Sequence, residues 1–136
     1  FDEVKFELNS VSLDTISSGE YNRLRLALLT SMSEFDIVDN GILFLDEIDA
    51  NLSGKESDAI SKVLKKLSNS YQIFAISHQP QLTSSADQHF LVDKLNGKSF
   101  VKELNSKEKI NEIARMISGE KVTPEALDFA KNLLKS

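Results

Sequence analysis

Three carboxylates follow directly on a short apolar run in the stretch FDIVDNGILFLDEIDANLSG, residues 35–54. Asp46 and Glu47 are adjacent, and Asp49 comes two positions later. If GILFL is a strand of a parallel sheet, these side chains lie beyond its carboxyl end, where open sheets bind ligands. Carboxylate oxygens suit Mg²⁺, and a neighbouring carboxylate can orient or deprotonate a water. The pattern therefore predicts a metal and phosphate site, with acids that merely cap the next segment as the alternative.

A small-residue loop opens into a helical pattern in the segment TISSGEYNRLRLALL, residues 15–29. Ser17, Ser18 and Gly19 would lie at the start of the helix, where free N–H groups and the helix dipole attract anions. The Ser17 hydroxyl can donate to a phosphate oxygen, and a glycine allows the backbone to approach it closely. The loop therefore indicates an anion site, and a simple N-cap without a ligand remains the alternative.

The elements that must position these residues alternate between strands and helices. Strands are predicted from Val4 to Leu8, with a possible hairpin, from Gly41 to Leu45, and from Gln72 to Ser77. The last two read as buried parallel strands, and the amphipathic segment between them completes a βαβ unit. The helix from Glu20 to Ser33 has a wide apolar stripe, so we expect it to be buried on more than one side.

A hairpin and two helices are predicted for the rest of the chain. Asn96-Gly97 lies between two alternating segments and is typical of a type I′ turn, which needs two residues with positive φ. Ile110, Ile113, Ala114 and Ile117 recur at helical spacing before a stop at Gly119. Thr123-Pro124 then predicts a capped start for a last helix through Leu127, Ala130 and Leu134. The order of elements indicates an α/β core followed by helices.

Composition limits the classes of function. The 136 residues are 40% hydrophobic and 27% charged, contain no cysteine and carry a net charge of −5. No apolar run approaches the roughly 18 residues of a membrane helix, so we expect no membrane partner. The acidic, alternating start is unlike a signal peptide and lacks an initiator methionine, which predicts a fragment. A uniformly basic nucleic-acid surface is excluded; a local patch such as Lys62, Lys65 and Lys66 is more typical of a solvated helix face.

Four motifs in order resemble those of the ABC ATPase superfamily. ISSGE before a helix resembles the signature motif, and ILFLDE resembles Walker B of P-loop NTPases, in which the aspartate serves the metal. DEIDANLS is similar to the D-loop, with Asp49 at its key position, and His78 after the next predicted strand is similar to the switch histidine. The finer resemblance is to the RecN family of bacterial DNA-repair ATPases, which are relatives of the SMC proteins.

The resemblance to RecN covers residues 4–134. ISHQPQLTSSADQHFLVDK and the closing INEIARMISGEKVTPEALDFAKNLL are similar to that family, and the latter separates it from transporter and SMC heads. One departure is Ser18, which stands where the family usually has a glycine. No G-x-x-x-x-G-K-[ST] motif occurs in the sequence. Residues 1–136 therefore resemble the C-terminal lobe of a split ABC-type head, a mainly parallel sheet flanked by helices with a β-hairpin and C-terminal helices.

The resemblance implies an ATPase that uses ATP and Mg²⁺. Asp46 would hold the metal, Glu47 would polarise the attacking water, and His78 would contact the γ-phosphate. The remaining implied nucleotide contacts, made across a homodimer of ATP-sandwiched heads, are Ser17, Ser18, Gly19, Glu20 and Asp49. The Walker A lobe and the coiled coil lie outside this chain, so the chain alone is expected to be inactive.

The implied role is repair of DNA double-strand breaks and recombination, with DNA bound by the full-length protein. The implied location is the cytoplasm, in association with the nucleoid. Two alternatives stay open: the head lobe of another SMC-like or ABC ATPase, and a non-hydrolysing interaction module that keeps the same fold.

Overall fold

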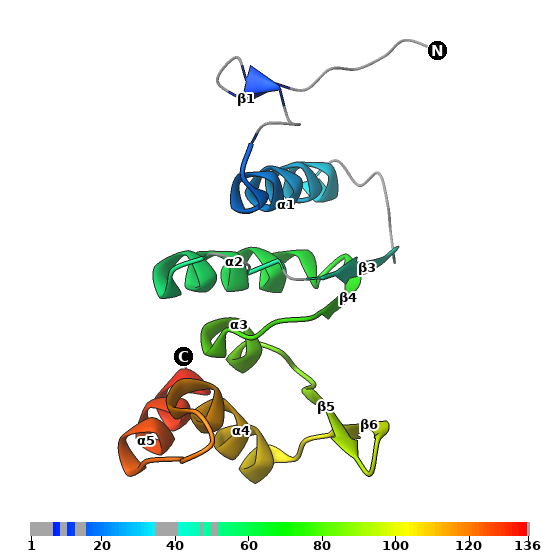
Figure 1. Ribbon diagram of the computed structural model, residues 1–136. Coiled ribbons are helices and arrows are strands. Elements are labelled where there is room, and N and C mark those ends of the chain that lie inside the picture. The colour runs from blue at the N-terminus through cyan, green and yellow to red at the C-terminus, as the bar shows by residue number, and fades with distance from the viewer. Residues whose placement is uncertain are drawn as a thin grey trace. The chain divides into compact units, whose positions relative to one another are not determined.

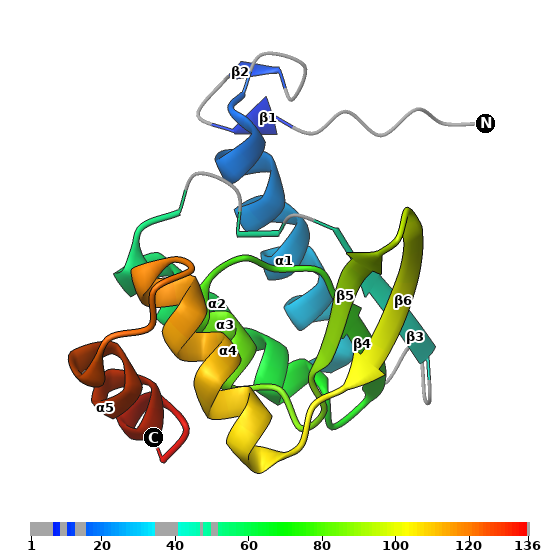
Figure 2. The same ribbon diagram turned by 60° about the horizontal axis from the view of Figure 1, so that its bottom comes forward.

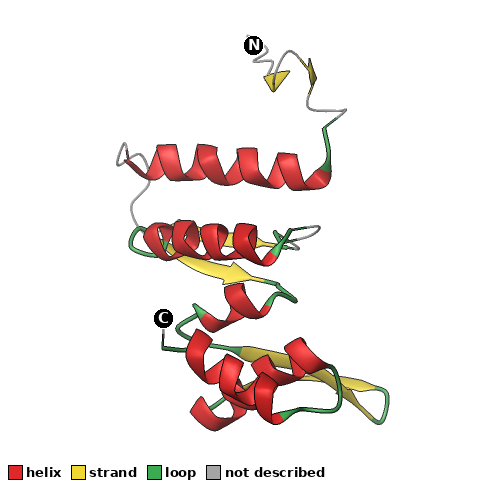
Figure 3. Ribbon diagram, turned by 90° about the vertical axis from the view of Figure 1, so that its left-hand side faces the viewer, coloured by secondary structure: helices red, strands yellow, loops and turns green. Residues whose placement is uncertain are grey.

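The computed structural model describes residues 7–8, 11–12, 16–34, 41–46, 48–49 and 52–135. The described elements begin with two strands, alternate between helix and strand as far as a second pair of consecutive strands, and end with two helices (Figures 1 and 3). The residues form two compact units, each described by itself below. The first unit comprises Phe1–Ser53 and Lys62–Ile76, and the second comprises Gly54–Ser61 and Ser77–Ser136.

The first unit begins with a hairpin and a long helix. β1 (Glu7–Leu8) pairs antiparallel with β2 (Val11–Ser12), which confirms the hairpin; the rest of the predicted first strand lies outside the described residues. The helix α1 (Ser18–Glu34) covers the predicted segment. Leu26 is buried, but Leu28 is 40% exposed. The expected burial on several sides is wrong for the described residues, because the stripe is wider than the surface that the unit packs against it.

The predicted βαβ unit is confirmed. β3 (Gly41–Leu45) pairs in parallel with β4 (Tyr71–Ala75), with Phe44 opposite Phe74. The helix α2 (Gly54–Leu67) connects the two strands. Parallel neighbours need such a crossover because the chain leaves the first strand at one end of the sheet and must enter the second strand at the opposite end.

Burial of the β3–β4 pair differs from the prediction. One face is covered, as Leu45 and Tyr71 show with 2% and 7% exposure. The other face is open to solvent, where Phe44 is 70% exposed and Phe74 is 47% exposed. Continuous apolar strands predict cover on both faces, but the described residues of this unit supply it on one. The strand β4 also ends at Ala75, before the predicted Ser77.

The amphipathic stripe of α2 packs as its spacing predicts. Ile60, Leu64 and Leu67 recur at four and three residues and are 6%, 8% and 0% exposed. The lysines of the predicted patch occupy exposed positions on the same helix: Lys62, Lys65 and Lys66. The helix thus buries one stripe and presents its charges to water.

The second unit contains a short helix and a hairpin. The helix α3 (Pro80–Ser84) has proline at its first turn, a start signal that the sequence analysis did not use. β5 (Phe90–Leu95) and β6 (Lys98–Glu103) pair antiparallel (Figure 2). The connecting Asn96 and Gly97 have φ of 51° and 76°, as the type I′ turn requires.

The last two helices form the core of the second unit. The helix α4 (Ser106–Ser118) is capped by Asn105 and ends at Gly119, whose φ is 79°. The helix α5 (Pro124–Leu133) is capped by the Thr123 hydroxyl, which accepts from Ala126 N–H. The start of α5 and the glycine stop of α4 are as predicted. The helices meet through a fully or almost fully buried cluster: Ile113, Ala114, Ala126 and Ala130.

Candidate functional site

The start of α1 is closed by a capping box between Ser17 and Glu20. The Glu20 carboxylate accepts from the Ser17 hydroxyl at 2.7 Å and from the Ser17 N–H at 3.0 Å. In return, Glu20 N–H donates to Ser17 Oγ at 3.3 Å. A serine three residues before a glutamate forms this reciprocal pair at many helix starts. Ser17 therefore acts as an N-cap in this structure, and the donors proposed for a phosphate bind the Glu20 carboxylate.

Electrostatics at this helix start favour an anion. Hydrogen bonds from the Ser17 hydroxyl and N–H lower the pKa of Glu20, and the charge of Arg23 adds to the effect. Each of these groups stabilises the ionised carboxylate. An exposed helix start that holds one carboxylate in this way offers donors of the kind that a phosphate oxygen uses.

The neighbouring small residues lie in the first turn of α1. Ser18 is the first helical residue, so its backbone has the negative φ of a helix. Its replacement of the usual glycine therefore causes no backbone strain in this structure. Gly19 is buried, while Ser17 is exposed.

The predicted carboxylates after β3 differ in their exposure to solvent. The side chain of Asp46 is exposed, whereas Ile48 and Asp49 are buried in the turn that follows. The Asp49 carbonyl accepts from Leu52 N–H at 3.2 Å, which holds this turn. Glu47 lies outside the described residues. The structure thus offers one carboxylate to solvent at the strand end and places a second in the interior of the turn.

Arg25 connects α1 to β3, and the sequence analysis missed it. Its guanidinium donates to the carbonyl of Phe44 at 3.3 Å. Carbonyls alternate in direction along a strand, and Leu45 O accepts from Ile76 N–H, so Phe44 O points to the opposite edge of β3. This contact ties α1, which Ser17 caps, to the strand that ends before Asp46. Sequence spacing gives no signal for it, because the partner is a backbone atom.

His78 belongs to the second unit and follows shortly after β4. Its side chain is exposed. Beside it, Ser77 Oγ accepts from Gln79 N–H at 3.0 Å, which shapes the turn before α3. The residue is therefore accessible to a ligand from solvent, at the position expected from the sequence.

The described donors fit a magnesium ion in a limited way. Among the residues that the structure describes, no group of three or more His, Cys, Asp or Glu side chains could hold a metal. Mg²⁺ in phosphate sites is usually held by one or two carboxylates together with waters and substrate phosphates. One exposed carboxylate at Asp46 is compatible with that arrangement.

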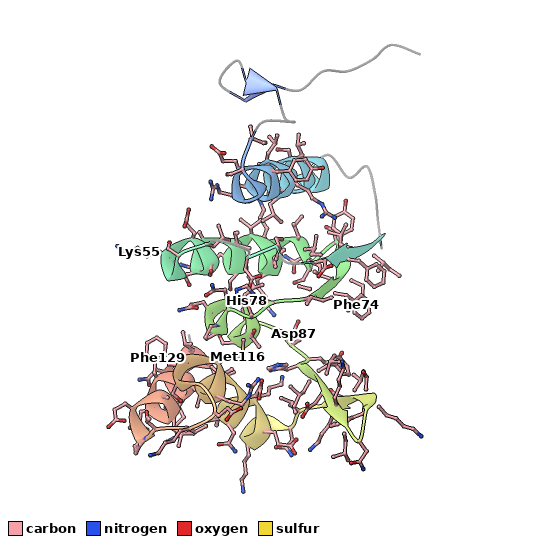
Figure 4. The ribbon with its side chains drawn as sticks, in the orientation of Figure 1. Lys55, Phe74, His78, Asp87, Met116 and Phe129 are labelled. Atoms are coloured by element: carbon pink, nitrogen blue, oxygen red, sulfur yellow. The ribbon has the colours of Figure 1, made fainter. Side chains whose placement is uncertain are left out.

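The open side of the β3–β4 pair forms what we term the bare face. Its members alternate along the two strands and their extension, so they point the same way. Phe44 stacks on Phe74, which Figure 4 labels, and their ring centroids lie 5.1 Å apart. The face comprises Ile42, Phe44, Phe74 and Ile76, which are 61%, 70%, 47% and 66% exposed. Contiguous apolar surface of this kind marks a site of contact with another protein segment.

Among the described residues, no helix has the length and apolar character needed to cross a membrane.

Comparison with known proteins gives consistent matches. No family model matches the chain. The DNA repair protein RecN of Helicobacter pylori is 51% identical over 129 residues, which are 95% of this chain. RecN of Rickettsia conorii is 42% identical over 122 residues, and RecN of Halalkalibacterium halodurans is 38% identical over the same length. Over this region the chain is similar to the RecN proteins of several bacteria. It spans about a quarter of the length of the curated relatives, 25% for the Helicobacter protein.

Solved structures similar to this chain are SMC ATPase heads. A head from work on ATP-driven dimerization and DNA-stimulated activation of SMC ATPases matches with a TM-score of 0.61 and 22% identity, over 81% of this chain and 66% of that one. The Smc head domain of Pyrococcus furiosus matches with a TM-score of 0.61 and 26% identity, over 79% and 26%. The α/β fold of an ABC-type head lobe is thus confirmed. The much higher identity to RecN favours that family over another SMC-like head.

Proposed function

We propose that this chain is the C-terminal lobe of the ATPase head of an SMC-like protein that repairs DNA double-strand breaks. The observation that carries the proposal is the 51% identity to a DNA repair protein over 95% of the chain. The similar SMC head studied for ATP-driven dimerization supports the same mode of action here. The role includes recombination, and the protein would act in the cytoplasm at the nucleoid.

In this proposal, ATP closes two heads upon each other. Ser17, Ser18, Gly19 and Glu20 of one head would face the γ-phosphate held by the partner head. The capping box supports this role, because a phosphate oxygen could replace the Glu20 carboxylate on the Ser17 hydroxyl and N–H. That exchange substitutes one anion for another at the same donors, so it needs no new arrangement of the helix.

The hydrolytic groups would come from the end of β3 and from the turn after β4. Mg²⁺, when bound, would neutralise phosphate charge, and Asp46 would hold it. Glu47 would orient and polarise the attacking water, and His78 would donate a hydrogen bond to the γ-phosphate. Asp49 is fully buried, so contact across the dimer would require its turn to open when the heads close.

The Walker A lobe of the same protein would complete each head. The bare face supports this partner, since a sheet with parallel strands normally has cover on both faces. The chain contains no G-x-x-x-x-G-K-[ST] motif, so the phosphate loop must come from that lobe.

The test is Glu47→Gln in the full-length protein that contains this chain. A positioned general base contributes about 10²–10⁴-fold in rate, so ATP turnover should fall by roughly that factor while ATP binding persists. ATP-bound dimers should accumulate, which size-exclusion chromatography with light scattering would detect. The purified 136-residue chain should hydrolyse no ATP.

Glu56→Gln on α2 is a matched control, because it removes one exposed carboxylate outside the proposed site. Parental turnover in Glu47→Gln would remove Glu47 from the mechanism. Rapid hydrolysis by the 136-residue chain alone would contradict the split head.

A further inference from the structure

A basic cavity of about 370 Å³ opens against the helix pair α4–α5. Three of its six lining residues are lysines and none is acidic. Two aliphatic side chains and one serine complete the lining. The residues of this lysine cavity are Ser106, Lys109, Ile110, Lys131, Leu134 and Lys135.

The helix pair determines the backbone positions from which the three lysine side chains project. Lys109 belongs to α4, while Lys131 and Lys135 belong to the end of α5 and the turn after it. Ile110 and Leu134 of the cavity also pack against the buried cluster that joins the two helices. The floor of the cavity is therefore part of the core of the second unit, and the three side chains project from a preorganised frame.

Two of the three lysines have internal partners, and both of these contacts lie at the surface. Lys109 Nζ donates to the carbonyl of Asp87 at 2.8 Å, which leaves further hydrogens on the ammonium. Lys131 Nζ lies 3.0 Å from Asp128 Oδ1, but both side chains are largely exposed, at 50% and 75%. Exposed pairs of this kind contribute little to stability and exchange partners easily. For Lys135, the described residues provide no ion-pair partner.

The positive character of this cavity comes from side chains, because the start of α4 is already capped. The Asn105 carboxamide accepts from Lys107 N–H and Glu108 N–H, at 3.0 and 3.1 Å. The chain as a whole carries a net charge of −5. A cluster of three lysines is therefore a local exception on an acidic protein, and it confines the attraction for a polyanion to a small area.

We propose that the lysine cavity binds a phosphodiester of duplex DNA. The ammonium groups of Lys109, Lys131 and Lys135 would contact phosphate oxygens, and the aliphatic floor would lie against the sugar. Lysines act on phosphate as point charges and read no base, so this contact holds DNA regardless of sequence. The assignment rests on the proposed DNA-repair function and places one DNA contact in the closing helices.

The experiment is a salt titration of DNA binding by the full-length protein. Fluorescence anisotropy with a labelled 30-base-pair duplex would be measured from about 50 to 200 mM NaCl, the range in which phosphate contacts change affinity strongly. Each lost phosphate contact lowers the slope of log K against log salt by about 0.9. Lys131→Gln with Lys135→Gln should therefore lower the slope by roughly 2 and weaken binding by up to about tenfold per lysine at 0.1 M salt.

Two variants make the result specific. Lys62→Gln with Lys65→Gln removes the same charge from exposed positions of α2 and should leave the slope unchanged. Lys131→Arg with Lys135→Arg keeps the charge and should restore parental binding. An unchanged slope in the cavity variant, or equal losses in both glutamine variants, would overturn the assignment.

A binding measurement with inorganic phosphate distinguishes a DNA site from a site for a free anion. If phosphate binds the parental protein but not the cavity variant, while the DNA slope stays the same, the cavity takes a free anion and the DNA assignment is wrong. ATP turnover without DNA should be equal in all these variants. Loss of the DNA contact can thus be distinguished from failure of the ATPase proposal, which would appear as absent turnover in the parental protein.

Discussion

The α4–α5 pair and the β3–β4 pair complete their apolar surfaces in different ways. The helix pair meets through Ile113, Ala114, Ala126 and Ala130, none more than 4% exposed. The strand pair buries Leu45 and leaves the bare face in solvent. Both segments have apolar residues at the spacing of their secondary structure. The difference is that the two helices cover each other, whereas one face of the strand pair has no packing partner among the described residues.

The closing helices α4 and α5 complete their own core, whereas the strand β3, which leads to the residues of the proposed chemistry, does not. The closing helices have caps at both starts and a glycine stop, so each end is satisfied within the segment. The strand that leads to Asp46 depends on Arg25 from α1 at its outer edge and lacks cover on one face. Residues that act at an interface between lobes are expected on the incomplete side.

Ile113→Ala should give the largest loss of stability in the helix pair. Ile113 is fully buried, and replacing a buried isoleucine by alanine costs about 2–5 kcal/mol through lost transfer energy and a cavity. Urea denaturation of the 136-residue chain would measure it. Ile117→Ala is the matched control, because Ile117 lies one turn later and is 38% exposed, so its loss should be well under half as large. Equal losses would show that the helix pair is not closed.

Phe44→Ala tests the strand pair in two contexts. In the 136-residue chain it should cost about 1 kcal/mol, mainly the stacking with Phe74, since Phe44 is 70% exposed. In the full-length protein it should cost about 3–5 kcal/mol, as for a buried phenylalanine, if another lobe covers the bare face. Thermal or urea unfolding of both proteins would provide the comparison.

Phe129→Ala on α5 is the control for context. Phe129 is 48% exposed and belongs to the closing helices (Figure 4), so its cost should be similar in the chain and in the full-length protein. A cost of Phe44→Ala that does not rise in the full-length protein would show that the bare face stays uncovered.

Local signals were enough to predict most elements of the fold. Asn96-Gly97 and Thr123-Pro124 determine backbone geometry through their own chemistry, so the hairpin turn and the start of α5 lie where predicted. The short helix α3 was missed because five residues carry too little periodicity, although Pro80 marks its start. Burial was predicted least well, since the apolar run at Phe44 does not reveal whether its cover is in the same chain.

The candidate site stays a prediction. Motif order indicated Ser17, Asp46 and His78 as site residues, and the structure leaves all three exposed to solvent. The contact between Glu20 and Ser17 follows from their three-residue spacing, which is that of a capping box. The resemblance to the signature motif indicated only a phosphate at the same residues. Arg25 could not be found from sequence, because its partner is a carbonyl 19 residues away.

The smallest effect concerns two capping boxes: Ser17 with Glu20 at the start of α1, and Asn105 with Glu108 at the start of α4. Hydrogen bonds from Ser17 lower the pKa of Glu20, whereas the Lys102 ammonium and the Asn105 N–H lower the pKa of Glu108. A carboxyl with a lowered folded pKa stabilises the fold above its unfolded value of 4.5, and the benefit is lost as pH falls through the folded pKa. Both boxes should therefore weaken below about pH 4.5.

Ser17→Ala should change the pKa of Glu20 and leave the pKa of Glu108 unchanged. Loss of the hydroxyl removes the largest cause of the Glu20 shift, so the pKa of Glu20 should rise toward 4.5 while that of Glu108 stays lowered. Carboxyl ¹³C chemical shifts followed through a pH titration of the 136-residue chain would measure both groups at once. In the full-length Glu47→Gln protein, ATP and Mg²⁺ should raise the pKa of Glu20 alone, because a phosphate oxygen would take its donors at Ser17. A Glu20 pKa that does not respond to nucleotide would mean that the capping box persists in the dimer, and the proposed exchange of anions at Ser17 would be wrong.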